Sequence, residues 1–185
     1  VASRGEVVVS FDRMNRVLDF EPADRLVTCQ AGVVTAALQS FAAERQLFYP
    51  VDFASSGSSQ IGGNVATNAG GIKVIRYGMT REWVAGLRVV TGAGDLLDCN
   101  RGLIKNATGY DLRHLFVGSE GTLGLVVEVD IRLTAPPEPQ RVMVLGVPRF
   151  RDILAVLDRF QQALTLSAFE FFSELALEKV TAHRK

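Results

Sequence analysis

The sequence has no excess charge of either sign. It contains 20 lysines and arginines against 20 aspartates and glutamates, so the formal net charge is zero. A chain of this kind has no long-range field that would attract nucleic acid or an anionic membrane surface. We therefore expect no nucleic-acid partner, and an anionic ligand would have to be held by local geometry.

Cysteine and histidine are scarce. Cys29 and Cys99 stand alone in strand-like runs, without a C-x-x-C pair, and His114 and His183 are far apart. These spacings favour no metal site in the chain. We interpret the cysteines as buried free thiols in a reducing compartment, which predicts a cytoplasmic location; a disulfide between them is the alternative. The histidines are interpreted as surface or capping residues.

Long apolar runs are absent as well. No stretch approaches the about 20 apolar residues that a membrane-spanning helix needs, so we expect no membrane span, and we recognise no signal peptide. The chain opens at Val1 on a strand-like run and stops at Lys185 soon after a helix begins. We therefore expect a piece of a longer protein.

The remaining pattern predicts a domain of mixed α and β class. Apolar alternation and turn residues predict strands over 7–11, 17–20, 26–30, 84–91, 96–99, 123–133, 142–147 and 167–171. The 92–95 turn predicts a hairpin, and the proline-rich 135–139 segment is predicted to be a linker. Helical spacing predicts helices over 33–42 closing near residue 46, over 111–116 with Thr108 or Asp111 as its cap, over 150–164, and from Ser173 onward.

The most distinctive segment is rich in glycine and runs from Gly57 to Gly78. It matches neither the G-x-G-x-x-G turn of dinucleotide-binding folds nor the phosphate loop of nucleotide triphosphatases, because Gly63-Asn64 stands where the latter needs Lys-Ser/Thr. The diglycine steps at 62–63 and 70–71 leave backbone N–H groups unshielded. The residues between them can form one or two helical turns over 61–67, with free N–H donors at the start. The segment either binds a flat or anionic ligand or is a tightly packed structural loop.

A second glycine cluster follows the 111–116 helix. Gly118, Gly121 and Gly124 surround the entry to a long strand and would again expose backbone there. We interpret Glu120 as a residue that braces this turn through neighbouring amides, in preference to an acid–base role.

Together the two clusters resemble the FAD-linked oxidases of the vanillyl-alcohol oxidase and p-cresol methylhydroxylase superfamily. The likeness rests on Ile61-Gly62-Gly63-Asn64 through Asn68-Ala69-Gly70-Gly71, on Arg76-Tyr77-Gly78, and on Gly118-Ser119-Glu120-Gly121-Thr122-Leu123-Gly124. Within that superfamily the sequence is similar to the D-2-hydroxyacid dehydrogenase branch. The runs at 106–112 and 168–172 favour the members that oxidise D-2-hydroxyglutarate over those that oxidise D-lactate or glycolate.

The resemblance implies an α+β class and a partial two-lobe FAD-binding fold of the p-cresol methylhydroxylase type. The FAD-binding domain would cover 1–135, with lobe 1 at about 1–52 and lobe 2 at about 53–135, and 136–185 would begin a substrate or cap domain. FAD would be bound non-covalently between the lobes. The positions that match the family's FAD-binding stretches are Pro50, Asp52, Gly57, Ser58, Ile61, Gly62, Gly63, Asn64, Thr67, Asn68, Gly70, Gly71, Tyr77, Gly78, Gly118, Glu120, Gly121 and Val126, the last through its backbone.

The same resemblance defines what this stretch does not contain. An upstream pyrophosphate loop, the cap domain and a C-terminal segment carrying the substrate-binding cation and a divalent-metal site are expected elsewhere in the protein. No residue here is a candidate for the general base. The implied partners are a small 2-hydroxy acid, an electron acceptor that the sequence does not identify, and a second copy of the chain in a homodimer. An FAD oxidase of sugars or alcohols and a non-catalytic FAD-binding or assembly fragment are the alternatives.

Overall fold

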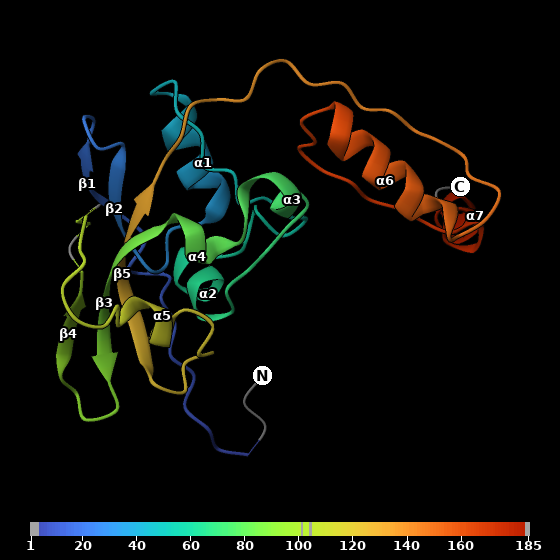
Figure 1. Ribbon diagram of the computed structural model, residues 1–185. Helices are drawn as coiled ribbons and strands as arrows, with labels where there is room; N and C mark the ends of the chain where they lie inside the picture. Colours follow the sequence, from blue (N-terminus) through green and yellow to red (C-terminus); the bar gives the residue numbers. More distant parts are fainter. Residues whose placement is uncertain (1–3, 101, 104, 184–185) are drawn as a thin grey trace.

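The fold is built on one five-stranded antiparallel sheet (Figure 1). A computed structural model describes residues 4–100, 102–103 and 105–183. The strands are β1 (Val17–Glu21), β2 (Leu26–Gln30), β3 (Val84–Thr91), β4 (Leu96–Cys99) and β5 (Gly124–Arg132), in the order β1-β2-β5-β3-β4. Each neighbouring pair is antiparallel, so the α+β class predicted from the sequence is confirmed.

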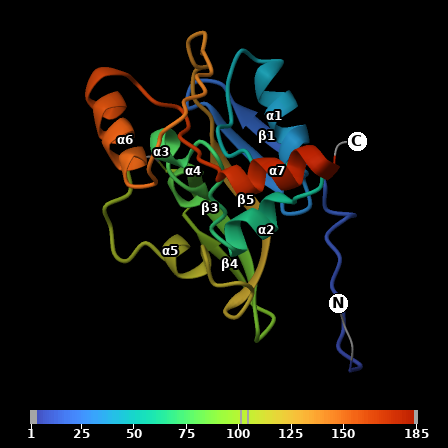
Figure 2. The same ribbon diagram turned by 90° about the vertical axis from the view of Figure 1, so that its right-hand side faces the viewer.

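Helices cover one face of this sheet. They are α1 (Thr35–Ala43), α2 (Ile61–Ala66), α3 (Val74–Tyr77), α4 (Thr80–Trp83) and α5 (Arg113–Phe116). Two further helices, α6 (Asp152–Ala163) and α7 (Glu174–His183), follow later in the chain and do not belong to this layer. Figure 2 shows α1 and α2 in front of the strands. The core lies between these layers, because alternate strand residues point to the same face. Its members include Val27, Val129 and Leu87 from the sheet, Leu38 from α1 and Val65 from α2.

The two cysteines lie in one row across the sheet. The strand register aligns Cys29 with Val129, Val129 with Leu87, and Leu87 with Cys99. Three strand spacings of about 4.8 Å separate the cysteines by roughly 14 Å, far beyond disulfide reach. Both are free and buried, as the sequence predicted, and the reducing compartment stays a prediction.

Three predicted strands are wrong. The segments 7–11, 142–147 and 167–171 form no strand, and Val7 and Val142 are 88% and 93% exposed. An apolar alternating run becomes a strand only when a neighbouring strand accepts its backbone hydrogen bonds, and no described strand pairs with these runs. The helices predicted at 150–164 and from Ser173 are confirmed as α6 and α7, which lie apart from the sheet in Figure 1.

Two boundaries differ from the sequence prediction. The helix predicted over 33–42 begins at Thr35, and the one predicted over 111–116 begins at Arg113. Leu112 occupies the N-cap position of α5 and makes no side-chain cap bond. Asp111 does accept the backbone N–H of Arg113 at 3.2 Å, whereas Thr108 makes no bond to the helix.

The sheet joins the two halves of the predicted FAD-binding domain. Strands β1 and β2 come from residues before 52, and β3 to β5 come from residues after it. The pairing of β2 with β5 connects the halves directly. The lobe boundary near residue 52 and the domain boundary at 135–136 stay predictions. No helix in the described part of the chain has both the length and the apolar character needed to cross a membrane.

Candidate cofactor site

Helix α2 lies within the first glycine segment, and its start is hydrogen-bonded to the turn after β2. The N–H of Ile61 donates to the carbonyl of Val33 at 2.8 Å, and the N–H of Gly62 donates to the carbonyl of Ala31 at 2.7 Å. The prediction of free donors at the start of this helix is therefore wrong for these two groups. Because a side chain has no room here, Gly62 is required: a Cβ on it would lie 2.6 Å from the Cβ of Ala31.

Gly63, the next residue, has a different environment. It is exposed, and a Cβ placed on it would meet no atom within 4 Å. Packing therefore does not explain the glycine, whereas the close approach of a ligand to the backbone would. Of the diglycine step, Gly62 fits the structural-loop interpretation and Gly63 fits the ligand-binding interpretation.

An open cavity of about 510 Å³ lies beside α2. This volume falls within the range of roughly 300–1,000 Å³ typical of cofactor and ligand pockets. Its lining residues come from the loop before α2, from α2 and from the loop after it: Phe53, Ala54, Ser55, Ser59, Asn64, Thr67, Ala69, Gly70 and Gly71. Small side chains, hydroxyl groups and exposed backbone give a wall that suits a flat, polar cofactor, so the site fits FAD.

Asn64 is held at this wall by a buried hydrogen-bond chain. Its amide Nδ2 donates to the hydroxyl Oγ1 of Thr35 at 2.7 Å, and that hydroxyl lies 2.8 Å from the hydroxyl of Ser59. Thr35 is fully buried and Asn64 is 4% exposed. The chain fixes the amide plane of Asn64 at the cavity. Sequence reasoning did not identify Thr35 or Ser59, because a hydroxyl residue near a helix start or in a serine-rich turn carries no distinct signal.

The part of the cavity wall formed by Gly70 and Gly71 packs against the backbone of Asp52. Gly71 has a φ of +118°, and a Cβ on it would lie 2.2 Å from the carbonyl oxygen of Asp52. The same carbonyl accepts the N–H of Ile72 at 3.1 Å. The Asp52 carboxylate forms an ion pair with Lys73 at 2.8 Å. The carboxylate of Asp52 is thus paired with Lys73, and Asp52 contributes to the cavity by holding the backbone at Gly71 and Ile72 in place.

The second glycine cluster lies against the end of α2. The N–H of Gly118 donates to the carbonyl of Val65 at 3.0 Å, and the N–H of Glu120 donates to the carbonyl of Ala66 at 2.8 Å. The structure therefore brings together the two segments that the sequence singled out. The prediction that Glu120 braces this turn through neighbouring amides is wrong: its exposed side chain makes no hydrogen bond among the described residues, and only its backbone N–H bonds, to α2.

The predicted site residues divide into three groups in the structure. Asn64, Thr67, Gly70 and Gly71 line the cavity. Gly57, Ser58, Gly63, Gly118, Glu120 and Gly121 are exposed in the turns and helix around it. The others are in packing, capping or ion-pair positions: Pro50, Ile61, Gly62 and Val126 are buried, Tyr77 packs between Phe48 and Trp83, Gly78 ends α3, and Asp52 forms its ion pair with Lys73.

Asn68 belongs to this last group. It adopts a φ of +47°, and its side-chain oxygen accepts the backbone N–H of Arg81 at 3.0 Å. Left-handed backbone is tolerated by asparagine better than by most residues. Its amide therefore caps the start of α4, and a direct contact of this side chain with FAD stays a prediction.

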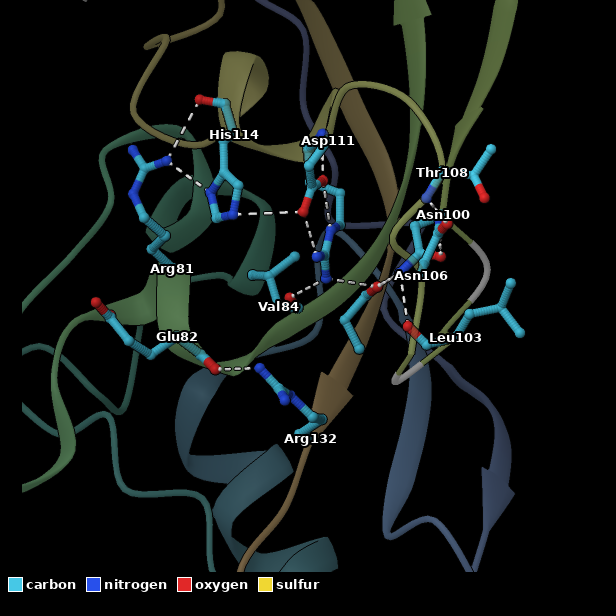
Figure 3. Close-up of polar contacts among 12 residues, drawn as sticks. Arg81, Glu82, Val84, Asn100, Leu103, Asn106, Thr108, Asp111, His114 and Arg132 are labelled. Atoms are coloured by element: carbon cyan, nitrogen blue, oxygen red, sulfur yellow. Dashed lines mark hydrogen bonds and ion pairs between the residues drawn. The ribbon is translucent and has the colours of Figure 1, made fainter.

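A polar cluster behind the second glycine segment was not found from the sequence (Figure 3). Arg81 contacts His114, and His114 Nε2 lies 3.5 Å from the carboxylate of Asp111. The Arg113 guanidinium binds the same carboxylate through Nε at 2.8 Å and lowers the pKa of Asp111 below its ordinary value. Arg113 also donates to the carbonyls of Val84 and Ala85, both at 2.8 Å. The motif around Asp111 thus anchors the second glycine segment to β3.

Comparison with known proteins agrees with this site. Residues 1–100 match the family model described as an FAD binding domain. D-2-hydroxyglutarate dehydrogenase of Stutzerimonas stutzeri is 66% identical over 180 residues, or 97% of this chain and 39% of that protein. The mitochondrial D-2-hydroxyglutarate dehydrogenase of Bos taurus is 44% identical over 96% of this chain and 33% of its own length.

A solved structure shows the same fold. Alkyldihydroxyacetonephosphate synthase superimposes with a TM-score of 0.66 at 25% sequence identity, over 82% of this chain and 27% of that protein. The chain therefore spans well under half the length of the relatives that it matches. The family match, these relatives and the antiparallel α+β sheet fit the vanillyl-alcohol oxidase and p-cresol methylhydroxylase superfamily that the glycine motifs indicated. The chain belongs to the FAD-binding domain family.

Proposed function

We propose that this chain is the FAD-binding part of an enzyme that oxidises the hydroxyl group of a D-2-hydroxy acid, with D-2-hydroxyglutarate as the first candidate substrate. The relatives named D-2-hydroxyglutarate dehydrogenase support the substrate, since one of them is 66% identical over 97% of this chain. The observation that carries the role of this chain is the contact between the two glycine segments beside a cavity of about 510 Å³.

The residues of this chain would bind and orient the cofactor. Thr67, Asn64 and the backbone from Ala69 to Gly71 would hold it along the cavity, and Gly63 would admit it close to the main chain. Gly118, Glu120 and Gly121 would hold its other half. When bound, FAD supplies a hydride acceptor for the carbon that bears the substrate hydroxyl group.

Binding is expected to be non-covalent, and catalysis is expected to need residues outside this chain. Among the described residues, no three His, Cys, Asp or Glu side chains are grouped so that they could hold a metal ion. We assign no general base to this chain, and we expect the base and any divalent metal in another part of the protein. A cytoplasmic location and a homodimer stay proposals, and the Bos taurus relative is named as mitochondrial.

The decisive experiment uses the full-length protein. Flavin absorbance of the purified protein tests cofactor binding, and release of all flavin by acid precipitation tests non-covalent attachment. Reduction of a dye acceptor is then measured with D-2-hydroxyglutarate, D-lactate, glycolate, a sugar and a simple alcohol. We expect the highest kcat/KM with D-2-hydroxyglutarate. Protein that carries FAD but oxidises only the sugar or the alcohol would support the oxidase alternative, and FAD-loaded protein inactive on every substrate would support a non-catalytic role.

A further inference from the structure

Arg81 forms hydrogen bonds both to Asn68, beside the cavity wall, and to Val117, beside the second glycine segment. Figure 3 shows its contacts with His114. Its guanidinium Nη2 donates to the carbonyl of Val117 at 2.9 Å. Its Nη1 lies 2.9 Å from Nδ1 of His114 and donates to the carbonyl of that residue at 3.3 Å. Its backbone N–H donates to the side chain of Asn68 at 3.0 Å.

These bonds reach residues on both sides of the site. Asn68 stands between Thr67 and Ala69, which line the cavity, and Val117 immediately precedes Gly118. Thr80, the neighbour of Arg81 in α4, donates its backbone N–H to the carbonyl of Ala69 at 2.9 Å. Helix α4 therefore holds the end of the cavity wall through its backbone, and the Arg81 side chain connects that helix to the second glycine segment.

Only an arginine can make this connection. A guanidinium offers five N–H donors in a rigid plane, whereas a lysine ammonium is a single point that cannot reach separated acceptors at once. The contact also fixes the proton on His114: because a guanidinium only donates, Nδ1 of His114 accepts, and its Nε2 carries the hydrogen that faces Asp111.

We propose that Arg81 is a positioning residue for FAD. It does not line the cavity, and it sets the spacing between the two glycine segments that would grip the two halves of the cofactor. Without its side chain, the bonds of Gly118 to Val65 and of Glu120 to Ala66 still join the two segments, but the bond from the Arg81 guanidinium to Val117 is lost. The second segment then moves more freely, and FAD must order it on binding, which lowers affinity. This inference rests on the FAD-binding role proposed above.

The test compares Arg81→Met with Arg88→Met in the full-length protein. Arg88 is a matched control, because it is a half-buried arginine that binds two carboxylates, Asp98 and Glu128, on the sheet face away from α2. FAD dissociation constants are measured by flavin fluorescence after removal of the cofactor. We expect Arg81→Met to raise the Kd about tenfold, as the loss of one or two net hydrogen bonds implies, and Arg88→Met to change it less than about twofold.

Two further measurements separate positioning from general stability. At saturating FAD, the flavin spectrum and kcat of Arg81→Met should return to those of the unmodified protein, because the cofactor restores the spacing. Without FAD, hydrogen exchange should accelerate at the amides of Gly118 and Glu120 and stay unchanged in β3. Arg81→Lys should behave like Arg81→Met, and it replaces that variant if the methionine protein does not fold.

Several results would overturn the proposal. They are an unchanged FAD affinity in both Arg81 variants, an equal loss in Arg88→Met, or failure of both Arg81 variants to fold when Arg88→Met folds, which would make Arg81 a general stability residue. Unmodified protein that binds no FAD would overturn this inference together with the proposed cofactor. Protein that binds FAD but does not oxidise D-2-hydroxy acids would contradict only the proposed function, since Arg81 is judged by FAD affinity.

Discussion

The backbone N–H of Gly118 donates a hydrogen bond of 3.0 Å to the carbonyl oxygen of Val65. Val65 lies in α2, at the centre of the first glycine segment, and Gly118 opens the second one. Two stretches far apart in the sequence therefore form one continuous surface beside the cavity. This contact supports a shared ligand more strongly than either glycine cluster does alone, because two unrelated structural loops would not have to contact each other.

Gly63 provides a test that separates stability from binding. Gly63→Ala should stabilise the protein without FAD by roughly 0.5–1 kcal/mol, since alanine is the better helix former and its Cβ enters open space. The same methyl group should weaken FAD binding, because it would stand where the cofactor approaches the backbone. Urea unfolding of cofactor-free protein and an FAD titration measure the two effects.

Gly62→Ala is the matched control for that variant. Its Cβ would lie 2.6 Å from the Cβ of Ala31, so we expect a loss of about 1–3 kcal/mol in the free energy of unfolding. If Gly63→Ala left FAD affinity unchanged, Gly63 would not belong to the binding surface.

Gly71 should be intolerant of any side chain. In Gly71→Ala, the methyl group would meet the carbonyl oxygen of Asp52 at 2.2 Å while the backbone keeps a φ of +118°. Residues forced into such a conformation cost about 1–3 kcal/mol before any clash is counted. Denaturant unfolding should show a loss of at least that size. Gly57→Ala, where a Cβ meets nothing within 4 Å, should change stability by less than about 0.5 kcal/mol.

The buried hydroxyl group of Thr35 should contribute measurably to the free energy of unfolding. Thr35→Val keeps the shape but leaves Nδ2 of Asn64 without an acceptor in a buried position, which costs about 1–3 kcal/mol. Thr35→Ser keeps the hydroxyl group and should lose less. A larger loss in the serine variant, measured by urea unfolding, would show that the methyl contact and not the hydrogen bond matters.

Cys29 and Cys99 should resist alkylation in the folded protein. Burial raises the pKa of the Cys29 thiol to about 12, with a further contribution from the charge of Asp130, and burial also raises the pKa of Cys99. At pH 8 both are neutral thiols, and the thiolate is the reactive form. Iodoacetamide followed by peptide mass spectrometry should label neither residue in the native state and both in urea. Labelling of Cys29 in native protein would contradict its buried position in the sheet.

The sequence predicted local features well and long-range contacts poorly. The hairpin of β3 and β4 follows from turn residues between two apolar runs, so its bounds were predicted to the residue. The 7–11 run has the same local pattern, but no strand in the described part of the chain pairs with it, and strand formation depends on such a partner. Likewise, glycine spacing indicated the cofactor segments, whereas Thr35 and Arg81 take their roles from residues distant in the chain.

Asp111→Asn should destabilise the protein in a way that depends on pH. The Arg113 guanidinium holds the pKa of Asp111 below its ordinary value of 3.8, so the folded state binds this proton less readily than the unfolded state. The carboxylate therefore contributes stability that is present above pH 3.8 and is lost as the pH falls through the lower folded-state value. The contribution should be modest and reduced by salt, because the Asp111 side chain is 39% exposed.

Urea midpoints measured from pH 7 downward test this relationship against a matched variant. The gap between the unmodified protein and Asp111→Asn should stay constant from pH 7 to pH 5 and narrow only below the ordinary aspartate value. Asp95→Asn, in the exposed turn of the β3–β4 hairpin, controls for removing a surface carboxylate. A gap that already closes between pH 7 and pH 5 would contradict this assignment, because an aspartate whose pKa is lowered stays ionised throughout that range. In that case the contact between Arg113 and Asp111 would not be the anchor of the second glycine segment, and the bonds from Arg113 to the carbonyls of Val84 and Ala85 would remain as its link to β3.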